Sequence, residues 1–377
     1  MMAELDNLPM MLRQLREQTH RDFSVYCCVN QPETDRSNTF AENQATLRLL
    51  GEVDDLDMHI IDRSSPGCGW SGKSKGVGWA RKELFDAIIH DRPTDELIVS
   101  MDADTAFSPT YLHTVFHTMN RHPGWDALCV PYYHPLNGNE PQDRALLRYE
   151  CYMRHYLISL LLIGNPYAFS ALGSAMVFSA NAYRKVGGIT PLQGGEDFYL
   201  LQKFAKTGIV GRRLEECVHP QGRISHRVPF GTGPAIQQGV DGQIGNRYPF
   251  YPQTAFDAVR QTFELMPLLY DADIETPMSA FLRRQLGTDN LWEPLRRNFK
   301  ARELFVHACH ERVDGLRILQ YLKTQLPANA NSDETELLSF CQRHQIAVPS
   351  GFSFSSSPLP EIDALRNALF DMEMQLR

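Results

Sequence analysis

The sequence predicts an α/β fold in which a mostly parallel sheet is flanked by helices, followed by a helical C-terminal region. Up to about residue 240, short apolar segments typical of buried strands alternate with segments of helical periodicity. Beyond that point strand-like segments become scarce and helical patterns dominate. We therefore expect one domain over residues 1–240 and a mainly helical region over residues 241–377.

The expected elements can be placed in order along the chain. The first is a helix over residues 8–18, whose apolar side chains recur at helical spacing and whose Pro9 lies where a helix start tolerates it. Buried strands are expected over residues 23–29, 59–61, 97–101 and 126–130. Further helices are expected over residues 79–89, 109–119, 256–269, 295–310, 316–326 and 361–376.

One usual element has no counterpart in this pattern. A doubly wound sheet begins with a strand before its first helix, and residues 1–6 are too short and too polar to form it. That strand is normally central, so its loss leaves a gap in the sheet. Either the start of the fold lies upstream, or another segment fills the position, and the sequence leaves both alternatives open.

Charge and cysteine content limit the classes of partner. The chain has 37 basic and 45 acidic residues, a net charge of −8, so nothing favours nucleic acid as a partner. Its eight cysteines form no CxxC pair and no signal peptide is visible, which predicts a cytoplasmic protein with buried thiols. The apolar stretch at residues 156–178 is interrupted by Gly164-Asn165-Pro166, so we expect no transmembrane helix. Peripheral contact with the inner face of a membrane stays open.

Two acidic residues, Asp102 and Asp104, directly follow the strongest strand pattern in the sequence. In open α/β sheets, ligands bind beyond the carboxyl ends of the strands. Two carboxylates one residue apart can hold a divalent cation, Mg2+ or Mn2+, which in turn binds diphosphate oxygens. A solvent-exposed acidic turn would have the same sequence, so the motif alone is weak evidence for a metal site. Its position at the end of a strand strengthens that evidence.

A second acidic pair, Glu196 and Asp197, follows Gly194-Gly195 and precedes a helical segment. The helix dipole favours acidic residues at a helix start, so capping alone would explain the pair. A carboxylate at such a corner can also act as the general base that takes a proton from an attacking hydroxyl. Taken with the acidic motif upstream, the pair indicates an active site.

From residue 4 to residue 233 the sequence resembles the family 2 glycosyltransferases, which are inverting enzymes with the GT-A fold. The matching segments are Glu4-Leu5-Asp6-Asn7-Leu8, the loop ending at Asp35, Gly76-Val77-Gly78-Trp79-Ala80-Arg81, Ser100-Met101-Asp102-Ala103-Asp104, residues 173–178, Val186-Gly187-Gly188 and Glu196-Asp197. The resemblance implies that Asp102 and Asp104 bind the metal and the donor diphosphate. It further implies that Asp197, or next Glu196, is the catalytic base.

The same resemblance implies the two substrates and the residues near the donor. The donor is expected to be a UDP- or GDP-sugar, and the acceptor a hydroxyl of a saccharide, a lipid or a small solute. Asn30 stands where Asp is usual in the loop that holds the nucleotide base, and Asp35 matches the later acid of that loop. Lys75 or Arg81 is expected to contact phosphate or base.

The segment over residues 223–233 is similar to the part of the family that follows the Glu-Asp helix. Arg223 and Arg227 are expected to bind phosphate, because a guanidinium is always charged and forked. His219 or His226 could supply a third metal ligand. Each histidine taken alone is better explained as a packing or surface residue.

Two other classes of protein compete with a transferase. Residues 67–74, GCGWSGKS, fit the P-loop pattern GxxxxGK[ST], and a P-loop NTPase would bind phosphates there. However, five residues separate the preceding strand from the first glycine, and Gly76 and Gly78 disfavour a helix starting at Lys73. The third class is a sugar-binding protein with a transferase-like fold and no activity, which the intact acidic pairs argue against.

Overall fold

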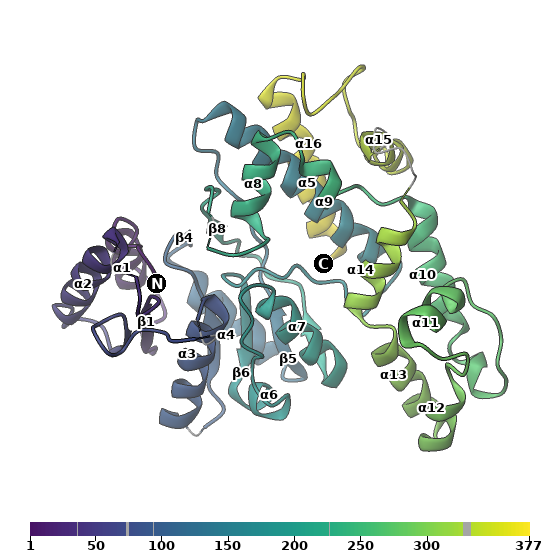
Figure 1. Ribbon diagram of the computed structural model, residues 1–377, viewed down its shortest axis with the longest axis horizontal. Coiled ribbons are helices and arrows are strands. Elements are labelled where there is room, and N and C mark those ends of the chain that lie inside the picture. The colour runs from purple at the N-terminus through teal and green to yellow at the C-terminus, as the bar shows by residue number, and fades with distance from the viewer. Residues whose placement is uncertain (36, 73–74, 93, 226, 327–332) are drawn as a thin grey trace. The chain divides into compact units, whose positions relative to one another are not determined.

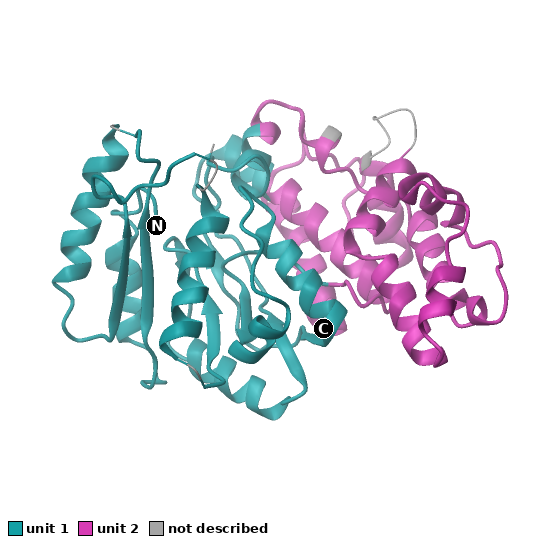
Figure 2. Ribbon diagram, turned by 60° about the horizontal axis from the view of Figure 1, so that its bottom comes forward, with its two compact units in different colours: residues 1–146, 169–237 teal, residues 147–168, 238–377 magenta. Residues whose placement is uncertain are grey.

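The computed structural model describes residues 1–35, 37–72, 75–92, 94–225, 227–326 and 333–377 (Figure 1). The chain forms two compact units (Figure 2). The first unit contains residues 1–146 and 169–237, and the second contains residues 147–168 and 238–377. The boundary at residue 240 remains our prediction for the domains, and the compact units differ from it in grouping residues 147–168 with the C-terminal part.

All strands of the described residues lie in the first unit. They are β1 (Val25–Asn30), β2 (Met58–Arg63), β3 (Leu97–Ser100), β4 (Thr105–Ala106), β5 (Trp125–Cys129), β6 (Met176–Ser179), β7 (Ile209–Gly211) and β8 (His219–Pro220). β1 and β2 pair in parallel, and β4 pairs with β8 antiparallel. A four-stranded sheet has the order β3-β6-β5-β7.

The α/β class is confirmed, but the described sheets are mixed rather than mostly parallel. β6 lies between β3 and β5 and is antiparallel to both, so only β5 and β7 are parallel neighbours in the four-stranded sheet. The long helix α5 (Glu140–Leu162) lies between β5 and β6 in the chain, and the two strands it separates run antiparallel. Alternation of apolar segments along the sequence does not reveal strand direction.

The expected gap in the sheet is present in the described part of the chain. β1 and β2 form a sheet of their own, and no described strand joins β1 to β3. The N-terminal residue lies along β1, because the Asn30 N–H donates to the Met1 carbonyl at 2.9 Å.

The helices of the first unit are α1 (Leu8–Arg16), α2 (Asn38–Gly51), α3 (Val77–Asp91), α4 (Tyr111–Arg121), α6 (Ala180–Lys185), α7 (Glu196–Thr207) and most of α8 (Thr232–Val240). Of these, α1, α3, α4 and α7 are close to the helices expected, whereas α2, α6 and α8 were not predicted. α3 and α7 both pack on the buried strand β6, since Phe178 lies 5.1 Å from Phe85 and 5.3 Å from Phe204 between ring centroids. The aromatic core thereby fixes the two helices that carry the acidic and basic side chains described below.

The second unit is helical, as predicted for the C-terminal region. It contains the larger part of α5, then α9 (Ile244–Arg247), α10 (Gln253–Leu265), the 3-10 helix η1 (Leu268–Tyr270), α11 (Ser279–Leu286), α12 (Glu293–Asn298), α13 (Arg302–Arg312), α14 (Gly315–Thr324), α15 (Asp333–Arg343) and α16 (Leu359–Leu376). α5, α15 and α16 share a core that includes Ile158, Phe340 and Leu369. Among the described helices, none has the length and apolarity needed to cross a bilayer.

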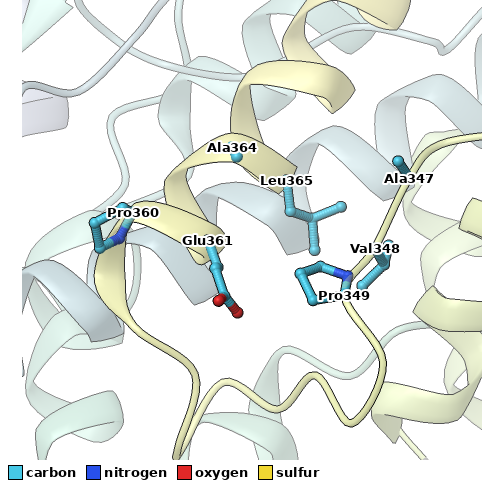
Figure 3. A pocket seen from close by; sticks show the side chains of 7 residues that line it. All are labelled: Ala347, Val348, Pro349, Pro360, Glu361, Ala364 and Leu365. Atoms are coloured by element: carbon cyan, nitrogen blue, oxygen red, sulfur yellow. The ribbon is translucent and has the colours of Figure 1, made fainter.

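An open pocket lies beside the start of α16 (Figure 3). Its lining is Ala347, Val348, Pro349, Pro360, Glu361, Ala364 and Leu365. All of these side chains except Glu361 are apolar, so the pocket has no arrangement of polar groups suited to catalysis.

Candidate active site

The first acidic motif lies where the sequence predicts it, between the end of β3 and the start of β4. Ser100, the last residue of β3, is buried and its hydroxyl donates to the Gly173 carbonyl at 2.6 Å, which fixes the strand end. The Asp102 side chain is 46% exposed and that of Asp104 is 17% exposed. Both carboxyls are thus partly accessible to a ligand at the carboxyl end of a strand, as α/β sheets favour.

The second acidic pair occupies the first turn of α7. Gly195 precedes it with φ +76°, a left-handed conformation that glycine adopts readily, and a Cβ there would lie 2.9 Å from Phe230 Cζ. Glu196 is buried and Asp197 is half-buried. The Asp197 carboxylate accepts the Phe198 N–H at 2.7 Å, so it is held at the helix start.

Arg81 of α3 connects the two acidic motifs. Its guanidinium donates to Asp102 Oδ1 at 2.7 Å through Nη2 and to Glu196 through Nη1. The side chain is 9% exposed. It lies against Gly173, where a Cβ would come within 1.9 Å of Nη2. We call Arg81, Asp102, Glu196 and Asp197 the Arg81 cluster.

The residues of a second group, the Glu4 cluster, surround the other carboxylate of the strand-end motif. The cluster consists of Glu4, Asp104, Arg223 and Arg227. Arg223 Nε lies 3.0 Å from Asp104 Oδ2, and Arg223 also pairs with Glu4. Arg227 Nη1 lies 2.7 Å from Glu4 Oε1. Of the two arginines expected to bind phosphate, Arg223 therefore stands next to a strand-end acid, and Arg227 joins the cluster through Glu4.

Crowding of carboxyls raises two pKa values in these clusters. Burial, and then the charge of Glu196, raise the pKa of Asp197 to about 7, although Arg81 opposes the rise. Burial, and then Asp102, raise the pKa of Asp104 to about 6, against the influence of Arg223. A carboxyl with a pKa near neutrality can exchange a proton at physiological pH, which suits Asp197 to the role of a base.

Together the clusters bring three arginines beside five carboxyls. When all are ionised, negative charge exceeds positive charge by two. Asp102 and Asp104 offer the oxygen ligands that Mg2+ and Mn2+ prefer, and a bound divalent cation would compensate the excess. In the described part of the chain, no group of three or more His, Cys, Asp or Glu side chains could hold a metal by itself. Donor oxygens and water would therefore have to complete the coordination.

The remaining predicted residues lie outside the two clusters. Asn30 is buried: its side-chain Oδ1 accepts from Trp70 Nε1 at 3.3 Å, and its Nδ2 donates to the Met1 backbone carbonyl at 3.0 Å. Asp35 accepts the Ser37 N–H at 2.9 Å beside the start of α2. Lys75 is exposed on the loop before α3. His219 lies in β8, with Nδ1 3.0 Å from the Tyr133 carbonyl. His226 lies outside the described residues.

The loop that fits the P-loop pattern is bound to a carboxylate of the protein itself. The Gly67 N–H donates to Glu33 Oε1 at 3.1 Å and the Gly69 N–H to Glu33 Oε2 at 2.8 Å. α3 begins only at Val77, beyond the end of the motif. Lys73 and Ser74 are outside the described residues. A P-loop directs its backbone amides at phosphate and starts its helix within the motif, so the described part of this loop does not match one.

The sequence did not single out Glu4 or Gly173 as parts of the site. Glu4 lies in the opening segment that resembles the family, but its partners are 219 and 223 residues away in the chain. Gly173 lies in another matching segment, and its role depends on the path of the Arg81 side chain. Spacing along a sequence carries no signal for contacts of this range.

An α/β unit with carboxylates at a strand end, an acidic pair at a helix start and arginines beside both is typical of enzymes that act on nucleotide diphosphates. Comparison with known proteins specifies the class further. Residues 97–245, which include both acidic motifs, match the family model described as glycosyl transferase family group 2. Over these residues the chain therefore carries a glycosyl transferase family 2 domain, a class of enzyme whose donors are nucleotide-sugars.

Two further comparisons add little to this assignment. No curated protein matches the chain. Among solved structures it is similar to the mannosyltransferase PcManGT from Pyrobaculum calidifontis, in complex with GDP-Man and Mn2+. The identity is 14%, the match covers 82% of this chain and 83% of that one, and the TM-score is 0.40.

Proposed function

We propose that the protein is a metal-dependent, inverting glycosyltransferase of GT-A-like fold that moves a sugar from a UDP- or GDP-sugar to an acceptor hydroxyl. The observation that carries the proposal is that Arg81 forms ion pairs with both Asp102 and Glu196. These pairs link the strand-end acids to the acidic pair of α7. A donor site and a base must lie this close together for direct transfer.

Each group has one role in this proposal. Asp102 and Asp104 hold a divalent cation, which when bound supplies positive charge against the leaving diphosphate. Arg223 and Arg227 contact the phosphates, since both are partly exposed and stand beside Asp104 or Glu4. Arg81 keeps the carboxylates of the two motifs in place. Glu196, buried and paired with Arg81, orients the first turn of α7.

Asp197 is the catalytic base in this proposal. Its carboxylate takes the proton from the acceptor hydroxyl as that oxygen attacks the anomeric carbon from the face opposite the diphosphate. The bond from the anomeric carbon to the diphosphate oxygen breaks, and the configuration inverts in this single displacement. The raised pKa of Asp197 makes it a stronger base than an exposed aspartate.

The first experiment is calorimetric titration with UDP, GDP and ATP, each with Mn2+ and each with EDTA. We expect UDP or GDP to bind only with the metal, and the binding to be lost in Asp102→Ala. Asp22→Ala is the matched control, because Asp22 is an exposed aspartate of the same unit. Preferential binding of ATP with or without Asp102 would overturn the proposal in favour of the P-loop class. Metal-dependent binding without any hydrolysis or transfer of a nucleotide-sugar would favour an inactive, sugar-binding relative.

A further inference from the structure

The two arginines of the Glu4 cluster converge on a single oxygen atom. Arg223 Nη2 and Arg227 Nη1 both pair with Glu4 Oε1. Arg227 Nη1 also donates to the Met2 carbonyl at 2.7 Å. The arginine side chains are each 34% exposed, whereas that of Glu4 is 7% exposed. Glu4 is thus the buried end of the cluster, and the arginines are its accessible end.

The Glu4 carboxylate is itself held in place. Its second oxygen accepts from Asn7 Nδ2 at 2.7 Å, and its backbone carbonyl accepts the Asn7 and Leu8 N–H groups at the start of α1. Asn7 also accepts from Gln221 Nε2 at 3.0 Å, so the same turn holds the segment that leads to Arg223. A carboxylate fixed this way can determine where a paired guanidinium lies.

Arg223 has two acidic partners, and only one of them is an expected metal ligand. When Asp104 gives its oxygens to a cation, the ion pair between Asp104 and Arg223 weakens, because cation and guanidinium compete for the same carboxylate. The pair with Glu4 is unaffected by that competition, since Glu4 faces the arginines and Asn7. An arginine without this second partner would gain conformational freedom, and ordering it again would cost affinity.

We propose that Glu4 is a positioning residue that keeps Arg223 and Arg227 in place for the diphosphate of a metal-bound nucleotide. This inference rests on the proposed function, and it concerns a residue that touches neither the metal nor the reacting atoms. Glu4 acts through the two arginines, so its effect must disappear when the arginines are absent.

The test measures the Kd of UDP and of GDP in the presence of Mn2+ for four variants and the wild type. Glu4→Gln keeps the shape and an acceptor for Asn7 but removes the charge, and we expect it to weaken binding about tenfold. Asp6→Asn removes an exposed charge from the same turn and should leave the Kd unchanged. Arg223→Gln/Arg227→Gln should weaken binding more strongly. Glu4→Gln added to that pair should have no further effect.

The outcomes separate this inference from the proposed function. If the wild type binds UDP or GDP with Mn2+ and Glu4→Gln binds equally well, Glu4 does not position the arginines and only this inference fails. Tighter binding in Glu4→Gln would show that Glu4 competes with phosphate, which also overturns it. An additional loss in the triple variant would indicate a general structural role instead. If the wild type binds neither nucleotide under any condition, the proposed function fails first.

Discussion

Both units contain a network of arginines and carboxylates, but the two networks differ in exposure and in charge balance. In the second unit, Arg154 and Glu150 of α5 pair with each other, and Arg154 also pairs with Glu373 of α16, with every side chain at 0% exposure. The ion pairs that extend this network join three arginines, Arg154, Arg366 and Arg377, to three carboxylates, Glu150, Asp363 and Glu373. In the first unit, three arginines stand beside five carboxyls, and several of these side chains reach solvent.

This is the difference expected between a network that stabilises the fold and one that binds a ligand. A buried network in which opposite charges balance has no charge left for a ligand, and losing one member leaves an uncompensated charge. A partly exposed network with excess carboxylates is unfavourable by itself, and a cation reduces that cost. Excess negative charge and the raised pKa values of two carboxyls, Asp104 and Asp197, are what our proposal for the first unit rests on.

The largest effect is expected from Asp197→Asn. The amide cannot take a proton, so transfer should fall by about 10²- to 10⁴-fold, while UDP or GDP binding with Mn2+ stays within twofold of the wild type. The measurement is single-turnover transfer or donor hydrolysis beside calorimetric titration. Transfer at the wild-type rate would refute the assignment of the base and direct attention to Glu196.

Arg154→Met tests the structural network. Removing a fully buried guanidinium breaks its ion pairs with Glu150 and Glu373 and leaves the buried network with an excess of negative charge, so we expect the free energy of unfolding to fall by about 3–5 kcal/mol. Urea denaturation followed by circular dichroism measures the loss. Arg260→Ala is the control, since Arg260 pairs with Glu264 on the exposed face of α10, and its loss should be within experimental error. Equal stability of both variants would contradict the comparison between the networks.

The third prediction concerns pH. A base works only when it is ionised, so activity should rise as pH increases through the pKa of Asp197, which is raised to about 7. Arg81 lowers that pKa, because its positive charge favours the carboxylate. Arg81→Gln should therefore move the rising limb of the pH–rate profile to higher pH by about one unit or more. Lys82→Gln, at the next and partly exposed position, should leave the rising limb at its wild-type pH.

An unchanged limb in Arg81→Gln would mean that another group sets the pH dependence. A shift toward lower pH would mean that the essential group is not a carboxyl whose charge Arg81 stabilises. Either result would contradict the assignment of the base to the Arg81 cluster. The donor site would still be tested independently by Asp102→Ala.

The elements that the sequence predicted share one property. β1, β2, β3 and β5 each appear as an apolar segment, and α1 and α10 show helical periodicity, so their own residues identify them. β4 and β8, with two residues each, exist only because they pair with each other, and no local pattern marks them. β6 is antiparallel to both of its neighbours, and no local pattern in the sequence shows the direction of a strand.

The site divides in the same way. Asp102, Asp104, Glu196 and Asp197 could be placed because each follows a strand end or a glycine corner visible in the sequence. The contacts among the clusters could not, since Arg81 and Glu196 are 115 residues apart and Glu4 and Arg223 are 219 apart. Residue types and local positions predict which chemistry is present. Tertiary structure decides which charges face one another.

The smallest effect is expected from Gly173→Ala, which changes the Arg81 cluster without removing a charge. A Cβ at residue 173 would lie 1.9 Å from Arg81 Nη2 and 2.1 Å from Cζ, so the flexible end of the arginine must move away from Asp102 and Glu196. Stability should fall less than in Arg154→Met, because the guanidinium is displaced and not removed, and transfer should fall about tenfold through misplacement of the carboxylates. Gly124→Ala is the matched control, because a Cβ there meets no atom within 4 Å.

The result distinguishes whether the position or the charge of the Arg81 guanidinium matters for transfer. Reduced transfer with an unchanged limb in the pH–rate profile would show that the position of the guanidinium matters more than its charge. Reduced transfer with a limb moved to higher pH would show that both act together on Asp197. Wild-type activity in Gly173→Ala would mean that neither ion pair of Arg81 orients the reacting groups, and Arg81 would then belong with the buried arginines of the second unit as a residue of stability alone.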